Sequence, residues 1–422
     1  MRIAVLGAGG REHAILAGLA RSGSVDKLWV VPGNTGTGAL AEPVTDVDPT
    51  DPAAVASWAE RTGIDLVVIG PEAPLVAGVA DELVARDLAV FGPTAAAARI
   101  EGSKSFAKDV MAAAGVPTAA AEIFTRPDKA LGALDRFGPP WVVKADGLAA
   151  GKGVTVTSDR GAAADAVIAA LIDGVHGDAG RRVLLEEYLD GPECSLFAVT
   201  DGQTVWPLAP ARDYKRVGEG DTGPNTGGMG AYSPLPDVGP ELVDQVRATI
   251  LEPTVAELAK RGTPYKGLLY AGLALTADGP KVIEFNCRFG DPETQVVLPR
   301  LTTDLPELLL AGAGAGDGKI EPRWDERACV TVVVAAKGYP GPYRRGLPIE
   351  GVEAAEALDG VTVFHAGTAH DATGRLVTAG GRVLAVTALG DTVAAARDLA
   401  YEAAGRIHFD GCHMRPDIAA GV

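Results

Sequence analysis

The sequence predicts a multidomain protein that combines α/β and α+β folds. Its 422 residues exceed what one ordinary core can organise, and typical domain sizes divide such a chain into about three domains. Hydrophobic residues make up 47% of the chain and charged residues 22%, which is the balance of a compact globular protein. The pattern of predicted strands and helices changes twice along the chain, which indicates three sections.

Residues 1–100 alternate apolar strands with alanine-rich helical stretches. The predicted strands are "RIAVLG", "KLWVV", "DLVVIG" and "LAVFG". This alternation is typical of a doubly wound parallel sheet, whose helices cover both faces. Ligands of such sheets bind at the carboxyl ends of the strands, and here those ends carry glycine-rich turns. We therefore expect an N-terminal Rossmann-like domain that binds a substrate.

The first glycine turn lies in "VLGAGGREHA", residues 5–14, and invites comparison with dinucleotide-binding dehydrogenases. Their fingerprint needs a third glycine, but Glu12 occupies that position. It also needs an acid about 20 residues on, at the end of the second strand. That strand runs instead into Pro32, Gly33 and Asn34. The turn is therefore better suited to a single phosphate at a helix N-terminus.

The other two sections differ from the first in their pattern. Residues 101–310 contain strands bounded by glycine loops, together with helices, and indicate an α+β domain with a nucleotide-binding lobe at about 120–190. Residues 328–422 contain the strands "ACVTVVVAAKGYP", "VTVFHAGT" and "GGRVLAVTALG" before a helix at 391–406. We expect this last section to form a small C-terminal α/β domain.

The stretch "VVKADGLAAGKGV" predicts a polyphosphate-binding loop. A strand delivers Lys144, and a loop with Gly147, Gly151 and Gly153 around Lys152 leads into another strand. Glycines let backbone N–H groups approach a polyphosphate, and the lysines supply positive charge. No Gly-Lys-Ser/Thr opens a helix here, so the loop is not a P-loop. Taken alone, the stretch is also compatible with a flexible glycine hairpin.

About 30 residues further on, "VLLEEYLDGPE" predicts a hinge that contacts a nucleoside. Backbone groups near Glu186 and Glu187 can face an adenine edge while Leu189 packs on the ring. Glu193 can accept hydrogen bonds from ribose hydroxyls. A solvated strand end is the alternative interpretation of these glutamates taken alone.

The stretch "KVIEFNCRFGDPE" predicts a metal site. In an extended strand, residues two apart face the same side, so Glu284 and Asn286 share one face with Arg288, opposite Ile283, Phe285 and Cys287. Oxygen ligands of this kind suit Mg²⁺, which takes its remaining ligands from water and nucleotide phosphates. The alternative interpretation is a strand that merely has one polar face. Arg288, which is in register with Glu284 and Asn286, favours the metal site over this alternative.

Charge and cysteine content restrict the partners and the compartment. The net charge of −17 disfavours nonspecific binding to nucleic acid or to an anionic membrane, since both need a basic face. The four cysteines form no CxxC pair, which is typical of reduced thiols in a cytosolic protein. We see no signal peptide, and no apolar run approaches the roughly 18 residues of a membrane span. We expect a cytoplasmic protein.

In their order along the chain, these motifs resemble the ATP-grasp superfamily, in which two α+β lobes clamp ATP between sheets. The chain is also similar to the glycinamide ribonucleotide synthetase family over essentially its whole length. The stretches that carry this resemblance are "GREHA", "GPEAPLVAG", "SKSFAK", "KADGLAAGKGV", "RDYKRVGEGDTGPNTGGMGAYSP", "YAGL", "IEFNCRFGDPE" and "FHAGT". The stretch at 212–234 is the most specific of them.

The resemblance implies a reaction in de novo purine synthesis. ATP phosphorylates the carboxylate of glycine, and 5-phospho-β-D-ribosylamine then displaces phosphate to give glycinamide ribonucleotide. It implies Mg²⁺ or Mn²⁺ at Glu284 and Asn286, and a monomer as the working unit. The implied residues are, for ATP, Lys104, Lys144, Gly147, Gly151, Lys152, Gly153, Glu186, Glu187, Leu189 and Glu193; for phosphoribosylamine, Gly9, Gly10, Arg11, Asn34 and Glu72; and for catalysis, Asp213, Lys215 and Arg288.

Two departures from the expected pattern and three other functions stay open at this point. Tyr214 stands where we expect histidine in many relatives, so its role is open. The strand "LLYAGLAL" offers no carboxylate for a second metal ion, so the number of ions is open as well. The other functions are another ATP-grasp ligase or carboxylase acting on a phosphoribosyl or carboxylate substrate, a dehydrogenase, and a noncatalytic nucleotide-sensing module.

Overall fold

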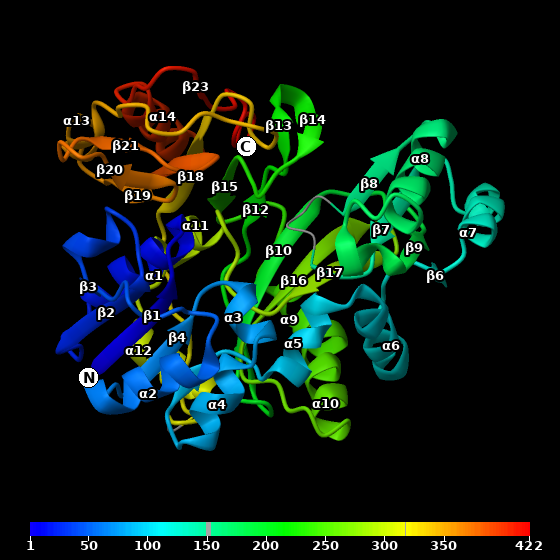
Figure 1. The fold of residues 1–422 in the computed structure, drawn as a ribbon, viewed down its shortest axis with the longest axis horizontal. Helices are drawn as coiled ribbons and strands as arrows, with labels where there is room; N and C mark the ends of the chain where they lie inside the picture. The colour runs from blue at the N-terminus through cyan, green and yellow to red at the C-terminus, as the bar shows by residue number, and fades with distance from the viewer. Residues whose placement is uncertain (149–152, 317) are drawn as a thin grey trace.

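The computed structural model describes residues 1–148, 153–316 and 318–422. Figure 1 shows three parts. The N-terminal sheet, in blue, lies below the C-terminal sheet, in orange, and a small lobe with β7, β8 and α8 projects to the right. The strands β10, β16 and β17 lie between these parts (Figure 1).

The N-terminal section forms a five-stranded parallel sheet with the order β3-β2-β1-β4-β5. Its strands are β1 (Arg2–Gly7), β2 (Lys27–Pro32), β3 (Glu42–Pro43), β4 (Leu66–Ile69) and β5 (Val90–Phe91). The order places β1 at the centre, so the glycine turn that follows it lies in the middle of the carboxyl edge.

Helices cover both faces of this sheet, because alternate strand residues point to opposite sides. Ile3 and Val5 pack with residues of α1 (Gly10–Ala20), whereas Ala4 and Leu6 pack with residues of α2 (Pro52–Thr62). The short helices α3 (Glu72–Val76) and α4 (Val79–Ala85) follow β4. The sheet is therefore doubly wound, as the sequence predicts.

The central section contains two antiparallel sheets of four strands each. The small lobe has the order β6-β9-β7-β8, from β6 (Ala121–Phe124), β7 (Trp141–Ala145), β8 (Val154–Thr157) and β9 (Val183–Glu186). The larger lobe has the order β11-β10-β16-β17, from β10 (Glu193–Thr200), β11 (Val205–Pro207), β16 (Gly267–Thr276) and β17 (Gly279–Asn286).

Helices pack against both lobes and connect them to their neighbours. They are α5 (Ala95–Gly102), α6 (Lys104–Ala114), α7 (Pro127–Ala133), α8 (Arg160–Leu171), α9 (Pro240–Val246), α10 (Glu252–Lys260), α11 (Thr294–Val297) and α12 (Leu305–Ala313). Helix α6 begins after Ser103, whose hydroxyl accepts a hydrogen bond from the N–H of Phe106. This cap fixes the start of the helix that carries Lys104.

The C-terminal section is built on an antiparallel sheet with the order β12-β15-β18-β22-β19, and β23 pairs with β18. Its elements are β12 (Arg212–Asp213), β15 (Gly230–Ser233), β18 (Ala328–Ala336), α13 (Val352–Glu356), β19 (Val361–His365), β20 (Thr368–His370), β21 (Leu376–Thr378), β22 (Arg382–Gly390), α14 (Val393–Ala404) and β23 (Cys412–His413). Strands β12 and β15 belong to the stretch 212–234, so this motif is anchored in the C-terminal sheet.

The predicted fold class is confirmed, with a parallel N-terminal sheet, two α+β lobes and a smaller C-terminal sheet with helices. The boundaries 1–100, 101–310 and 328–422 stay our proposed division of the chain. Among the helices that the structure describes, none is long and apolar enough to cross a membrane.

Candidate active site

Lys144 joins the two lobes of the central section. It stands on β7, and its Nζ lies 2.8 Å from Glu186 Oε2 on the adjacent strand β9. The same Nζ donates a hydrogen bond to the carbonyl oxygen of Ile283 on β17, at 3.0 Å. Both Lys144 and Glu186 are buried. The predicted ATP-binding lysine is therefore held where the small lobe meets the strand predicted to bind metal.

Two further lysines from α6 surround this pair. Lys104 Nζ donates to the carbonyl oxygen of Gly147, at 3.0 Å, and Lys108 Nζ lies 3.6 Å from Glu186 Oε1. Burial lowers the pKa of Lys104, although the nearby carboxylate of Glu284 opposes this shift. Sequence reasoning missed Lys108. The signal was present in "SKSFAK", because residues four apart on a helix share a face.

Asp146 anchors the start of α6 to the end of β7. Its carboxylate accepts hydrogen bonds from the backbone N–H of Ser105, at 3.0 Å, and from the Ser105 hydroxyl, at 2.6 Å. Arg182 lies 2.8 Å from the same carboxylate. These bonds place Lys104 beside the loop that follows Lys144.

The predicted phosphate loop is described only in part. Gly147 and Gly153 are described, and the N–H of Ala145 donates to the carbonyl oxygen of Gly153, at 2.8 Å. Gly151 and Lys152 lie outside the described residues. In the predicted hinge, the N–H of Glu187 donates to the carbonyl oxygen of Ala120, at 2.9 Å, so the hinge continues the ladder between β6 and β9. Leu189 follows it and is half-buried.

The strand β17 has the predicted alternation from Glu284 onward. Phe285 and Cys287 lie in the core, whereas Glu284 is partly exposed on the other face. The prediction was wrong for Ile283, because the register with β16 shifts between Gly272 and Leu273. This irregularity places Val282, rather than Ile283, in the core.

Arg288 follows β17 and contacts acids from two other segments. Its Nη2 lies 3.1 Å from Glu101 Oε1, and its Nε lies 3.5 Å from Glu72 Oε2. Burial alone would lower the pKa of Arg288, but these two carboxylates raise it. Arg288 Nη2 also lies 3.4 Å from Asn286 Oδ1. One side chain thus connects the metal strand with Glu72 in the N-terminal section.

Asp213 and Lys215 form a charged cluster with Glu193 from β10. Lys215 Nζ donates to Asp213 Oδ1, at 3.1 Å, and also to Glu193. Burial raises the pKa of Asp213 to about 7, while the ammonium group of Lys215 opposes the shift. Burial would lower the pKa of Lys215, but the two carboxylates raise it. The stretch 212–234 therefore brings a carboxyl group and an ammonium group to the larger lobe.

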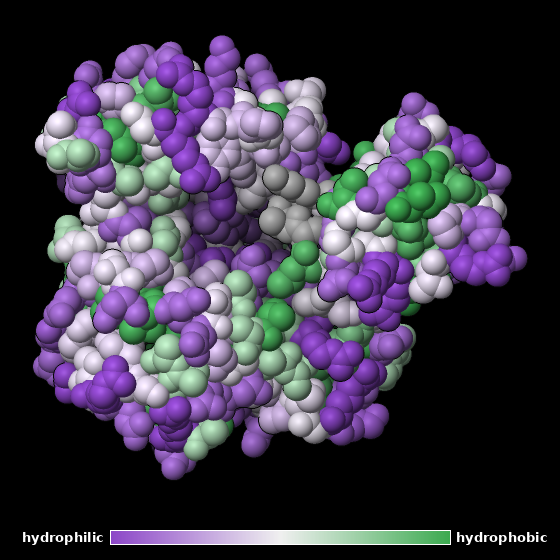
Figure 2. Space-filling view, in the orientation of Figure 1, coloured by the Kyte–Doolittle hydropathy of each residue, from purple (hydrophilic) through white to green (hydrophobic). Residues whose placement is uncertain are grey.

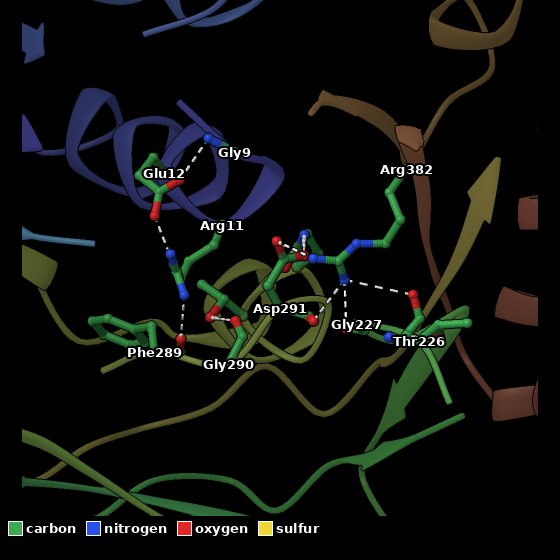
Figure 3. Close-up of polar contacts among 12 residues, drawn as sticks. Gly9, Arg11, Glu12, Thr226, Gly227, Phe289, Gly290, Asp291 and Arg382 are labelled. Carbon is green, nitrogen blue, oxygen red and sulfur yellow. Dashed lines mark hydrogen bonds and ion pairs between the residues drawn. The ribbon is translucent and has the colours of Figure 1, made fainter. Parts of the chain in front are cut away.

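The glycine turn after β1 is closed by Glu12. Its Oε2 accepts a hydrogen bond from the N–H of Gly9, at 2.6 Å, and its Oε1 lies 2.6 Å from Arg11 Nε (Figure 3). Arg11 Nη1 donates in turn to the carbonyl oxygen of Phe289, at 3.1 Å. The residue that breaks the dinucleotide fingerprint thus fills the space beside the turn, since a Cβ at Gly70 would lie 2.2 Å from its carboxylate.

Asn34 ties the N-terminal turns to the C-terminal section. Its Nδ2 donates to the carbonyl oxygens of Ala8 and His365, both at 2.8 Å. Its Oδ1 accepts hydrogen bonds from the N–H groups of Gly36 and Thr37. The predicted substrate residue therefore lies between the glycine turn and the stretch "FHAGT".

Arg382 and Asp291 form a junction that sequence reasoning missed. Arg382 Nη2 lies 2.9 Å from Asp291 Oδ2, and its Nη1 donates to the carbonyl oxygens of Asp291 and Gly227 (Figure 3). The two residues lie 91 positions apart, and no local pattern marks such a contact. Burial would raise the pKa of Asp291, but Arg382 and Arg11 lower it.

The surface is hollowed beside the small lobe. Figure 2 shows this hollow between the small lobe and the rest of the protein, and hydrophilic residues line it. Among the described residues, no group of three or more His, Cys, Asp or Glu side chains could hold a metal ion by itself. Glu284 and Asn286 are one carboxylate and one amide, so the predicted metal pair stays a prediction.

The whole fold has close structural neighbours. One neighbour is the biotin carboxylase domain of the Hydrogenobacter thermophilus 2-oxoglutarate carboxylase, solved with MgADP, ADP and bicarbonate. It has a TM-score of 0.74 at 16% identity, and the alignment covers 98% of this chain and 91% of the neighbour's chain. This likeness shows the fold alone. An ATP-grasp domain model matches residues 102–294, so the chain is an ATP-grasp enzyme, a class that uses ATP and a divalent metal ion.

Three domains of one family match successive parts of the chain. The phosphoribosylglycinamide synthetase N domain matches residues 1–101, the ATP-grasp (A) domain 102–294 and the C domain 329–421. The chain belongs to the phosphoribosylglycinamide synthetase family, and it is an ATP-grasp ligase of purine biosynthesis.

Two relatives extend over the full length. The phosphoribosylamine–glycine ligase of Streptomyces coelicolor is 55% identical and covers 100% of this chain and 99% of its own. The crystal structure of the Thermotoga maritima phosphoribosylamine–glycine ligase has a TM-score of 0.85 at 34% identity and covers 99% of this chain and 100% of its own.

Proposed function

We propose that this chain ligates glycine to 5-phospho-β-D-ribosylamine through a glycyl phosphate intermediate, releasing ADP and phosphate, in de novo purine biosynthesis. One observation carries the proposal. The strand with Glu284 and Asn286 continues into Arg288 and Phe289, which contact Glu72 and Arg11 of the N-terminal section. This connection supports a proposal in which the nucleotide site and the phosphoribosyl site meet along a single segment.

The chemistry of this reaction needs positioned charges rather than a protein nucleophile. A carboxylate is a poor electrophile, so the γ-phosphate of ATP is transferred to a carboxylate oxygen of glycine. The neutral amine of phosphoribosylamine then attacks the carbonyl carbon, phosphate leaves with the C–O bond electrons, and the nitrogen loses a proton. Catalysis rests on orientation and on the neutralisation of phosphate charge.

The ATP site lies where the two lobes meet. Lys104 and Lys144 hold the phosphates, and Glu186 acts through its ion pair with Lys144. The backbone at Gly147, Gly151 and Gly153, with Lys152, covers the phosphates. The hinge residues Glu187 and Leu189 face the base, and Glu193 accepts from the ribose. The contacts of Lys104 and Lys144 at the junction support this proposal, while Gly151 and Lys152 lie outside the described residues.

Mg²⁺ or Mn²⁺ would be held by Glu284 and Asn286 together with nucleotide phosphates. When bound, the ion would supply positive charge that makes the γ-phosphate easier to transfer. The fit rests on the donor set. Glu284 and Asn286 alternate with Phe285 and Cys287 along the strand, and Arg288 donates to the amide oxygen of Asn286.

Phosphoribosylamine binds at the N-terminal turns. The N–H of Gly9 is already used by Glu12, so the N–H groups of Gly10 and Arg11, in the first turn of α1, remain to donate to the 5-phosphate. Asn34 lies beside them, and Glu72 faces the ribose hydroxyls. The helix dipole of α1 favours the negative charge of the phosphate.

Glycine lies between these two sites. Asp213 receives its ammonium group, because a carboxylate in a buried position is stabilised by a cation. Lys215 and Arg288 neutralise the charge of the transferring phosphoryl group. In the proposed reaction, Asp213 binds and orients glycine and takes no covalent part.

The cellular setting is also part of the proposal. We infer that the enzyme works as a monomer in the cytoplasm and binds neither nucleic acid nor membrane. The net charge of −17 supports the absence of nucleic acid. The four cysteines are free thiols, which fits a reducing compartment.

A coupled assay of ADP release tests the function. ATP, Mg²⁺ and freshly formed phosphoribosylamine are supplied with and without glycine, and with bicarbonate in place of glycine. We expect ADP release only when glycine and phosphoribosylamine are both present. Release that is indifferent to glycine, or that depends on bicarbonate, would show that the assignment is wrong.

A further inference from the structure

Arg415 is a fully buried cation near the C-terminus that contacts the hairpin of β13 (Arg216–Gly218) and β14 (Thr222–Asn225). Its side chain is 1% exposed. Nη1 donates to the carbonyl oxygen of Arg216, at 3.0 Å, and to Asp221 Oδ1, at 2.7 Å. Burying a guanidinium is costly unless its donors are satisfied, so these contacts fix the hairpin against the tail.

Asp417 completes this arrangement. Arg415 Nε donates to Asp417 Oδ1, at 2.8 Å, and Nη2 donates to Asp417 Oδ2, at 2.6 Å, in a bidentate pair. The same Oδ2 accepts from the N–H of Gly220 at the tip of the hairpin, at 2.9 Å. The hydrogen bond from Arg415 lowers the pKa of Asp417. One carboxylate thus holds both the arginine and the hairpin tip.

Tyr214 is the third contact of this cation. The guanidinium carbon of Arg415 lies 4.9 Å from the centroid of the Tyr214 ring, within cation–π range. The N–H of Ala419 donates to the Tyr214 hydroxyl, at 2.8 Å. The open question of the tyrosine at this position thus has a structural answer, since Tyr214 packs against the C-terminal tail.

These contacts bracket Lys215. Its two neighbours in sequence, Tyr214 and Arg216, both contact Arg415. On the other side, the backbone N–H of Thr226 donates to the carbonyl oxygen of Lys215, at 2.7 Å. The tail therefore helps to fix the Lys215 backbone, together with the hydrogen bonds that join this segment to Thr226 and Gly230.

We propose that Arg415 is a positioning residue that, with Asp417 and Asp221, holds the hairpin so that Lys215 faces the transferring phosphoryl group. The catalytic consequence rests on the proposed function. Arg415 touches no substrate in this arrangement and acts through Lys215. Arg415→Lys keeps the positive charge but loses the planar guanidinium group. It should therefore reduce turnover, because a displaced Lys215 can no longer neutralise charge in the transition state.

A double-mutant cycle tests this dependence. Arg415→Lys is made in the wild type and in Lys215→Ala, and ADP release gives kcat and KM for ATP. In the wild type we expect kcat to fall by about tenfold or more with KM changed by less than about twofold. In the Lys215→Ala background the same change should cost less than about twofold, because the lysine it positions is gone. Equal losses in both backgrounds would overturn the proposal.

Two further variants keep the test decisive. Arg375→Ala removes an exposed ion pair with Asp371 in the same section and should leave kcat unchanged. If Arg415→Lys does not fold, Asp221→Asn replaces it in the cycle, since the Asp221 side chain is 68% exposed and its loss should spare the core. A wild-type kcat in Asp221→Asn would then contradict the proposal.

Hydrogen exchange gives a readout that does not need the reaction. In Arg415→Lys the N–H of Thr226 should exchange at least about tenfold faster than in the wild type, because local opening becomes easier. Unchanged protection would refute the positioning role even if the enzyme proved to have another substrate. If the wild type does not catalyse the proposed reaction but Arg415→Lys still exchanges faster at Thr226, only the proposed function is refuted.

Discussion

Gly10 lies so close to Gln295 that a Cβ atom at position 10 would stand 2.8 Å from the side-chain Nε2 of that residue. Gln295 is buried, and its Nε2 donates to Asp291 Oδ1, at 2.8 Å. The first turn of α1 is therefore closely packed against the side chain of Gln295 on α11. Any side chain at position 10 must displace the residues around the proposed phosphate site.

Gly10→Val should raise KM for phosphoribosylamine by roughly tenfold or more, because overpacking costs about 1 to 3 kcal/mol and here falls on the binding site. The affinity for ATP should remain nearly unchanged, since ATP contacts other segments. Initial rates at varied phosphoribosylamine check the first part, and equilibrium ATP binding checks the second. Gly23→Val is the matched control, because nothing lies within 4 Å of a Cβ there. A weaker affinity for ATP with an unchanged KM would contradict the separation of the two sites.

Lys144→Ala should weaken ATP binding by about 1.5 to 3 kcal/mol, the usual contribution of a charge-assisted bond to a phosphate. The variant also removes the 2.8 Å ion pair of the buried Glu186 and leaves it the longer contact with Lys108, so the thermal midpoint should fall as well. Titration with ATP well below that midpoint separates the two effects. Lys129→Ala, an exposed lysine on α7, should change neither quantity. An unchanged dissociation constant for ATP in folded Lys144→Ala would remove the lysine from the site.

The sequence predicted the parts of the site that lie within one strand or one turn. Glu284 and Asn286 share a face of β17 because the period of a strand is local, and the glycine turn follows β1 for the same reason. The junction of Arg382 and Asp291 could not be predicted, since it depends on how separate sections pack. The same holds for Arg415, whose partner Arg216 lies 199 positions away.

The shift at Ile283 shows a second limit of sequence reasoning. Alternation predicts the faces of a strand only while its register is regular, and the register of β17 with β16 is not. Glu12 shows the opposite case. Its presence at the third glycine position was visible in the sequence, and the structure supplies its physical role as the partner of the Gly9 N–H.

Asp213 should give the reaction a pH dependence near neutrality. Burial raises its pKa to about 7, and only the carboxylate form binds the ammonium group of glycine. We expect kcat/KM for glycine to rise between pH 6 and pH 8, with a midpoint of about 7. Asp213→Asn should be slow throughout and should lack this rise. A wild-type profile retained in Asp213→Asn would assign the ionisation to another group.

The same shift predicts how stability depends on pH. The folded protein keeps the Asp213 proton up to about pH 7, whereas the unfolded chain loses it near 3.8. The contribution of protonated Asp213 to the free energy of unfolding is therefore full below pH 3.8 and is lost as the pH rises to about 7. The wild type should therefore lose unfolding free energy relative to Asp213→Asn between pH 5 and pH 8. Urea unfolding of both proteins at these two pH values measures the difference. A difference that does not grow with pH would mean that folding does not raise the pKa of Asp213.

The metal strand gives the sharpest contrast between neighbouring residues. Glu284→Gln removes the only formal negative charge that β17 offers to the ion, so the enzyme should need roughly tenfold more Mg²⁺ for half-maximal rate. Phe285→Leu changes a side chain that is 3% exposed in the core, so it should lower the thermal midpoint and leave the Mg²⁺ requirement alone. Both variants are titrated with Mg²⁺ at saturating ATP, and their thermal midpoints are measured in parallel. If Phe285→Leu altered the metal requirement and Glu284→Gln did not, the ion would have to be held by other residues than this face of β17.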